Sequence, residues 1–151
     1  MTRQRGFTLI ELLIVVAIIG IIAAIAIPNL LNAINRGRQK RTMADIRGIG
    51  TALEAYSVDF HYYPKVAAAT VTDLVPYVQP TYMKVMPQLD GWNQPLVVML
   101  TSAGTSYTIY SKAKGNAGTI PAVGGPTTDF ENAIVFANGQ FYCWPEGMQT
   151  N

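Results

Sequence analysis

The chain is poor in the side chains that build catalytic centres. Its 151 residues include one histidine, His61, and one cysteine, Cys143. A histidine–cysteine metal cluster and an intrachain disulfide are therefore excluded. The sequence contains no HExxH pair, phosphate-binding glycine loop or Gly-x-Ser-x-Gly turn, and its carboxylates are scattered. We expect no enzyme, a surface position for His61 at a helix end, and a buried apolar role for Cys143.

Charge is also scarce, and it is unevenly distributed. Charged residues make up 13% of the chain, with a net charge of +2. Residues 48–151 carry four lysines against seven acids, whereas residues 36–47 are strongly basic. We call residues 36–47 the basic collar. Its only acidic residue is Asp45, and its basic residues are Arg36, Arg38, Lys40, Arg41 and Arg47. The collar attracts anionic lipid, meets acidic groups of neighbouring copies, or is simply solvated, and the sequence leaves these alternatives open. No aromatic residues are interleaved with the charges, so we expect no nucleic-acid partner.

An apolar run dominates the N-terminal part. From Phe7 to Ile27 there are 21 residues, all apolar except Thr8, Glu11 and Gly20. At about 1.5 Å of rise per residue, a helix of this length crosses a bilayer. Arg3 and Arg5 precede the run, so the positive-inside rule predicts that the larger, polar part of the chain is exported.

Glu11 does not fit an ordinary membrane span. A carboxylate inside such a segment costs about 2.5 to 3.5 kcal/mol and is tolerated mainly when it is paired. No basic residue lies within reach on its own helix beyond Arg5. If the chain were cut after Gly6, the new α-amino group of Phe7 in a neighbouring copy would supply a partner. That arrangement implies a polymer.

The residues Gly6-Phe7-Thr8-Leu9-Ile10-Glu11-Leu12-Leu13-Ile14-Val15-Val16, with Pro28 closing the run, resemble the class III signal of type IV pilins and type II secretion pseudopilins. The resemblance implies cleavage between Gly6 and Phe7 by a membrane peptidase, methylation of the Phe7 amino group, and assembly through Phe7, Glu11 and Pro28. Two alternatives are an ordinary secretory signal ending at Ala24-Ile25-Ala26 and a plain membrane anchor.

The rest of the chain predicts an α+β fold, with a long helix packed on a small antiparallel sheet. Apolar residues at alternating spacings of three and four form one helical stripe, which ends before Tyr63-Pro64: Ile46, Ile49, Leu53, Tyr56 and Phe60. Pro28 predicts a kink or a melted stretch between Gly20 and Pro28. We expect a leader over 1–6, a membrane and assembly helix over 7–28, an amphipathic helix over 29–63 and a head over 64–151.

Within the head we expect one short helix and two hairpins. The short helix spans Thr72–Val78, with Thr70 or Thr72 as its cap. The hairpins pair 96–100 with 106–110, and 133–137 with 140–144 across Asn138-Gly139. Lys112–Thr128 is glycine- and proline-rich and is predicted to be a long loop that needs an anchor.

Two further features resemble the major pseudopilin of type II secretion. Asp90-Gly91-Trp92-Asn93-Gln94-Pro95 is similar to a signature of that protein, with Gly91 and Asn93 in place of a proline and a glycine. The lack of an intrachain disulfide is also common among major pseudopilins. The resemblance implies a calcium ion that anchors the loop through Ser111, Asp129, Glu131 and loop carbonyls. The alternative is a loop held by hydrogen bonds.

The resemblance as a whole implies a structural subunit of a type II secretion pseudopilus, which helps to export folded proteins. The implied partners are further copies of the chain, the prepilin peptidase, an inner-membrane assembly platform and minor pseudopilins. The implied location is the inner membrane, with one span and a periplasmic head, and then the filament. The alternatives are a type IV pilin that forms surface fibres for adhesion or motility, and an anchored periplasmic module that does not polymerise.

Overall fold

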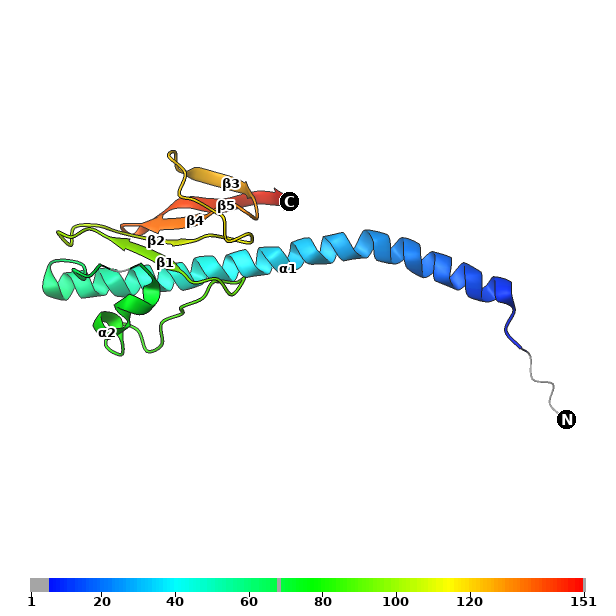
Figure 1. Cartoon of the computed structure of the whole chain (residues 1–151), viewed down its shortest axis with the longest axis horizontal. Coiled ribbons are helices and arrows are strands. Elements are labelled where there is room, and N and C mark those ends of the chain that lie inside the picture. The colour runs from blue at the N-terminus through cyan, green and yellow to red at the C-terminus, as the bar shows by residue number, and fades with distance from the viewer. Residues whose placement is uncertain (1–5, 68, 151) are drawn as a thin grey trace. The chain divides into compact units, whose positions relative to one another are not determined.

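The computed structural model describes residues 6–67 and 69–150, with the backbone alone for 148–150. It divides at Ile34/Asn35 into two compact units, and one helix, α1 (Leu9–Phe60), contributes to both (Figure 1). The expected leader, with Arg3 and Arg5, lies outside the described residues except for Gly6.

In the first unit, α1 passes through Pro28 without a break. The predicted alternative of a melted stretch between Gly20 and Pro28 is therefore wrong. Proline removes one backbone donor from the helix. The side-chain amide of Asn29 donates to the carbonyl of Ile25 over 3.1 Å and supplies another donor in the same turn.

In the second unit, α1 buries the predicted stripe. Ile46, Ile49 and Leu53 are fully buried, and Tyr56 is nearly so, whereas Phe60 remains about half exposed. The helix ends at Phe60, three residues before Tyr63. His61 adopts a left-handed backbone conformation with φ of 65° and its N–H donates to the carbonyl of Ser57, which terminates the helix. The predicted surface position of His61 at a helix end is confirmed.

The head is a five-stranded sheet with the order β1-β2-β4-β5-β3. Its strands are β1 (Val97–Leu100), β2 (Tyr107–Ser111), β3 (Gly125–Asp129), β4 (Ile134–Ala137) and β5 (Gln140–Thr150). Both predicted hairpins are confirmed. The strands of these hairpins form the predicted antiparallel sheet, and β3, which was not predicted, adds to β5 in parallel and makes the sheet mixed. The expected loop over 112–128 therefore ends in a strand that starts at Gly125.

The turn between β4 and β5 has the predicted chemistry. Asn138 and Gly139 have φ of 47° and 86°, the left-handed values that a two-residue hairpin turn requires. The predicted short helix is confirmed in part. It forms as a 3-10 turn, η1 (Val71–Leu74), followed by α2 (Val75–Val78), and Thr70 is its N-cap.

The core lies between α1 and these elements. The sheet covers one side of the helix and α2 lies on the other (Figure 1). Ile46, Ile49 and Leu53 share one cluster with side chains from both sides, including Val71, Leu74, Val98, Ile109 and Phe136. At Gly50 a Cβ atom would collide with the Phe136 ring, so the glycine allows helix and sheet to approach closely. From Asn35 onward, the apolar stripe of α1 therefore packs into the core as its spacing predicts.

Candidate assembly site

The candidate processing site lies just before the first helix. Gly6 and Phe7 are exposed and precede the start of α1 at Leu9. A Cβ atom on Gly6 would meet nothing within 4 Å. A peptide bond must be accessible for a peptidase to cut it, and both residues of the Gly6–Phe7 bond are exposed and lie outside the helix.

Glu11 closes a capping box with Thr8. The backbone N–H and the hydroxyl of Thr8 donate to Oε2 of Glu11 over 2.9 and 2.8 Å, and the N–H of Glu11 donates to the Thr8 hydroxyl over 3.3 Å. This reciprocal arrangement satisfies donors that the first turn of a helix would otherwise leave open. Sequence reasoning missed the role of Thr8, although the Thr-x-x-Glu spacing ahead of an apolar run is its signal. The capping box orients the carboxylate and leaves its other oxygen, Oε1, without a hydrogen bond among the described residues.

The helix that carries Glu11 is apolar all round and uncovered. Every Phe, Leu, Ile and Val side chain from Phe7 to Ile34 is between 43% and 81% exposed. A stretch of α1 near the N-terminus is long and apolar enough to cross a membrane. A helix that is apolar on every side requires lipid or other apolar helices around it.

A second group of residues joins the head to α1 near Asn35 and Thr42. Asp90 is 1% exposed, and its carboxylate accepts hydrogen bonds from the N–H groups of Trp92 and Gln94 and from the Ser111 hydroxyl, at 2.8, 2.9 and 2.6 Å. The turn built in this way contacts α1 at two points. The N–H of Gly91 donates to the Thr42 hydroxyl over 2.9 Å, and Nε1 of Trp92 donates to Oδ1 of Asn35 over 3.3 Å. We call residues 90–94 the clamp turn.

The clamp turn explains why the chain departs from the pseudopilin signature. A proline at position 91 would have no N–H for Thr42, and a Cβ atom on Gly91 would collide with the carbonyl oxygen of Arg38. Asn93 has φ of 61°, a conformation that asparagine tolerates better than most residues. Both replacements therefore suit the local backbone.

Two buried or half-buried tyrosines share one carboxylate in the head. Tyr107 and Tyr63 donate to Oε1 and Oε2 of Glu54 over 2.9 and 3.0 Å. Burial, and secondly the hydrogen bond to Glu54, raises the pKa of Tyr107 well above its usual range. The bond to Asp59 raises the pKa of Tyr82 to about 12. These hydroxyls remain protonated at neutral pH and serve as structural donors.

The structure brings together only two of the three side chains that were expected to bind calcium. Asp129 and Glu131 line one cavity with the glycine-rich segment 117–128, and the N–H of Glu131 donates to Oδ1 of Asp129 over 2.9 Å. Ser111 does not line this cavity. Its fully buried hydroxyl donates to Asp90 and accepts from the N–H of Ala113. Among the described residues, no group of three or more His, Cys, Asp or Glu is placed to hold a metal ion.

A long helix with an exposed apolar half and a capped acid near its start, joined to a small sheet, defines the class of pilin-like anchored subunits. Comparison with known families agrees. Residues 1–27 match the prokaryotic N-terminal methylation motif, and residues 29–124 match type II secretion system (T2SS), protein G. The chain belongs to the type II secretion system protein G family. Strands β3, β4 and β5 lie beyond the segment that this model matches.

Curated relatives support this assignment. The chain is 32% identical to type II secretion system core protein G of Escherichia coli K12 over 118 residues, which cover 72% of the chain and 81% of the relative. It is 31% identical to the protein of the same name from Aeromonas hydrophila over 132 residues, or 81% and 92%. The corresponding protein of Pseudomonas aeruginosa is 30% identical over 118 residues, or 72% and 82%. No solved structure gives a significant match.

Proposed function

We propose that the chain is the major structural subunit of a type II secretion pseudopilus and that it works by polymerising through the first half of α1. The observation that carries the proposal is the uncovered apolar surface from Phe7 to Ile34. Lipid covers this surface in the membrane, and helices of other copies cover it in the filament. When a subunit leaves the membrane for the filament, close packing against similar side chains replaces its contacts with lipid. The free-energy difference between the two states is therefore small, and specific contacts determine whether the filament forms.

Glu11 supplies the specific contact in this proposal. Both Thr8 donors bond to Oε2, which leaves Oε1 to accept from the α-amino group of Phe7 in an adjacent subunit after cleavage. Cleavage between Gly6 and Phe7 retains the N–H and the hydroxyl of Thr8, so the capping box survives processing. A buried ion pair of this kind sets the register between subunits, because each misplaced copy leaves a charge unpaired.

Three substitutions separate the charge of Glu11 from its capping role. Glu11→Ala removes both, Glu11→Gln retains a capping side chain without the charge, and Thr8→Val weakens the cap while retaining the charge. We expect Glu11→Ala and Glu11→Gln to lower the yield of sedimentable filaments at least about a hundredfold, as for the loss of one partner from a buried pair. Thr8→Val should have a much smaller effect.

Resistance to alkaline extraction from membranes is the control in each case. All three variants should remain inserted, and Glu11→Ala should insert better than the natural chain because it removes a charge from the apolar segment. Normal filament yield from Glu11→Gln would show that Glu11 acts only as a cap and would overturn the ion-pair mechanism.

The partners and location follow from the same proposal. The prepilin peptidase cuts after Gly6 and the Phe7 amino group is methylated, an inner-membrane platform and minor pseudopilins direct assembly, and the head lies in the periplasm. Mass spectrometry of the mature N-terminus tests the first step. Electron microscopy of producing cells tests the last, because short filaments within the envelope agree with the proposal and long surface fibres would instead indicate a type IV pilin.

Calcium remains a prediction for the 117–131 segment. Carboxylate oxygens of Asp129 and Glu131 with main-chain carbonyls are hard ligands that suit calcium, whereas the Ser111 hydroxyl is engaged with Asp90. If calcium anchors the segment, EDTA lowers the melting temperature of the full chain and added calcium restores it. In Asp129→Asn/Glu131→Gln the EDTA effect should disappear. An unchanged melting temperature would exclude calcium as a structural ion.

A further inference from the structure

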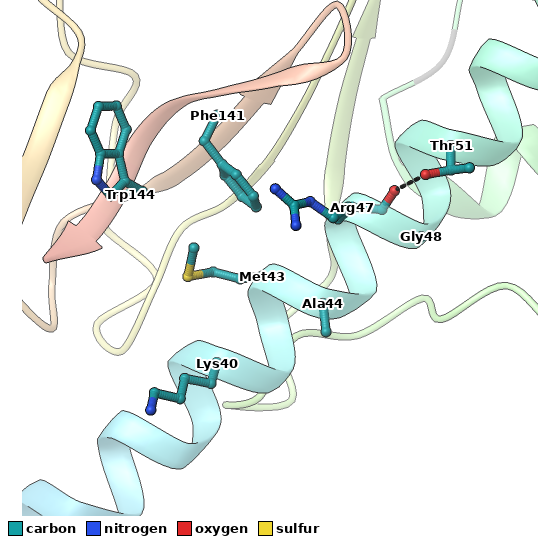
Figure 2. A pocket seen from close by; sticks show the side chains of 8 residues that line it. All are labelled: Lys40, Met43, Ala44, Arg47, Gly48, Thr51, Phe141 and Trp144. Atoms are coloured by element: carbon teal, nitrogen blue, oxygen red, sulfur yellow. Dashed lines mark hydrogen bonds between the residues drawn. The ribbon is translucent and has the colours of Figure 1, made fainter.

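One face of α1 forms a groove with the first part of β5, within the second unit. The residues that line it come from the helix and the strand: Lys40, Met43, Ala44, Arg47, Gly48, Thr51, Phe141 and Trp144 (Figure 2). The guanidinium of Arg47 lies 5.5 Å from the centre of the Phe141 ring, a cation–π contact. The lining is therefore largely apolar and aromatic, with two cations on its helical side. We call it the collar groove.

The positive charge of the collar groove is not neutralised by its own chain. Lys40 and Arg47 are exposed, and neither has an ion-pair partner in the part of the chain that the structure describes. The lining contains no acid, and Asp45, the only acid of the basic collar, pairs with Arg41 at 3.6 Å. The groove therefore suits a partner that presents a carboxylate beside an apolar side chain.

The end of the same helix carries this combination. Asp59 is exposed and stands between Val58 and Phe60, which are 73% and 47% exposed. The Tyr82 hydroxyl donates to Oδ2 of Asp59 over 2.6 Å, and Oδ1 has no hydrogen bond among the described residues. We call residues 58–60 the helix tip. It offers one carboxylate oxygen with an exposed apolar side chain on each side of it in the sequence.

The other exposed acids of the head do not offer this combination. Oδ2 of Asp73 accepts the N–H groups of Ala69 and Thr70 at the start of η1. Glu131 and Glu146 have no large exposed apolar residue as a neighbour in the chain. Within the described part of the head, the helix tip is therefore the segment that matches the collar groove.

The collar groove cannot receive the helix tip of its own chain. Lys40 and Asp59 lie on one continuous helix, and the residues between them correspond to about 28 Å of helical rise. This separation is far beyond the reach of the two side chains, so a helix tip in the groove must come from another copy. Two different surfaces that join copies in this way make a heterologous contact, which builds an open filament when the rotation between copies does not close a ring.

We propose that the collar groove of one copy receives the helix tip of a second copy, with the two helices parallel and shifted by about 28 Å along their axes. The carboxylate of Asp59 pairs with Lys40, and Phe60 packs on Met43 and Trp144. The contact uses only residues of the second unit, and it adds a charge pair between the heads of two copies to the pair that Glu11 forms. The inference rests on the polymerisation in the proposed function.

Reversal of the two charges, singly and together, tests the pair in filaments of the full chain. Asp59→Lys and Lys40→Glu each bring like charges together at the contact. We expect each to lower the yield of sedimentable filaments about tenfold, the factor that corresponds to about 1.4 kcal/mol. Asp59→Lys/Lys40→Glu restores an opposite pair and should recover most of the yield. The control is Asp59→Lys/Lys84→Glu, because Lys84 is exposed but lies outside the groove, so this variant restores only the net charge.

A further variant separates the contact from the folding of the helix end. Tyr82→Phe removes the hydrogen bond to Asp59 but retains the carboxylate, so we expect normal filament yield. Urea unfolding of the full chain in detergent should change no more in Asp59→Lys than in Tyr82→Phe. Equal losses of filaments from these two variants would assign the effect to the packing of the helix end and would overturn the contact.

Disulfide crosslinking identifies the partner and the type of contact. In filaments, Lys40→Cys/Asp59→Cys should form a ladder of linked multimers, because each copy contributes one groove and one tip. An equal mixture of the two single variants should form dimers and nothing larger. The control, Lys84→Cys/Asp59→Cys, should form no ladder.

Each outcome supports or overturns the contact. Filaments of normal yield from both single reversals, or filaments without the ladder, would overturn it. Dimers alone from Lys40→Cys/Asp59→Cys would indicate a symmetric pair of copies and would overturn the heterologous contact. A natural chain that forms no filaments would overturn the proposed function together with this contact, whereas normal filaments that are insensitive to these variants would overturn the contact alone.

Discussion

The two halves of α1 form one continuous α-helix, but the first half has an exposed apolar surface and the second half packs against the head. Up to Ile34, the large apolar side chains are all exposed, and the capped acid near the start is the only charged side chain of the described segment. From Asn35 onward the apolar residues of the helical stripe are buried except for Phe60 at its end, and polar side chains of the helix bond to the clamp turn. The first half depends on partners outside the chain, and the second half depends on the head.

This difference assigns separate tasks to one continuous helix. Substitutions before Ile34 should change insertion and assembly without changing the stability of the head. Substitutions after Asn35 should change the unfolding of the head and affect assembly only through it. Urea unfolding of the full chain in detergent, followed by tryptophan fluorescence, measures the second property separately from filament yield.

The largest expected loss of head stability is at the clamp turn. Asp90→Ala leaves two backbone N–H groups and the Ser111 hydroxyl without an acceptor in a buried site. We expect a loss of about 3 kcal/mol in the free energy of unfolding, since each unsatisfied buried donor costs about 1 to 3 kcal/mol. Asp90→Asn retains one acceptor oxygen and should lose clearly less. Equal stability of the Ala variant and the natural chain would show that the turn does not hold the head.

A pair of glycines compares the two halves directly. Gly50→Ala places a methyl group against the buried Phe136 ring, whereas a Cβ atom on Gly20 would meet nothing within 4 Å. We expect Gly50→Ala to lose about 1 to 2 kcal/mol in urea unfolding, because overpacking outweighs the higher helix propensity of alanine. Gly20→Ala should leave the unfolding of the head unchanged. An identical effect at both positions would remove the distinction between the halves.

The smallest expected effect is at the end of the helix. His61 is exposed and has φ of 65°, so His61→Gly relieves a conformation that costs most residues about 1 to 2 kcal/mol. The greater freedom of glycine in the unfolded chain offsets part of this gain. We expect a net stabilisation of about 0.5 kcal/mol in the same urea experiment. His61→Ala is the control, since alanine retains the strain, and a stabilisation of similar size from it would contradict the explanation.

Much of the fold was predictable because its signals are local. The helical stripe and the Asn138-Gly139 turn are short-range patterns, and the structure confirms them. Strand β3 was missed because Gly125-Pro126-Thr127-Thr128 contains little besides threonine that favours a strand. It forms because the edge of β5 offers backbone partners, a condition that exists only after the sheet has folded.

The candidate sites also divide into those with local signals in the sequence and those whose contacts are distant in sequence. Glu11 was recognisable as a misplaced charge, and the Thr8 cap lies within one helical turn of it. The contacts of Asp90 were not predictable, because Ser111 and the helix that receives the clamp turn are distant in sequence. The resemblance to pseudopilins implied that Ser111 binds calcium, and in the structure its hydroxyl donates to Asp90.

The single thiol of the chain has a practical consequence for the experiments above. Cys143 is 1% exposed and packs with Ala133 and Val135, with Tyr110 against them. Thiol reagents reach exposed cysteines far faster than buried ones. A cysteine introduced at an exposed position would therefore be the only site that labels rapidly in the native state. Pairs of such cysteines on the helix and the head would report neighbours in the filament by crosslinking, without replacement of the native cysteine.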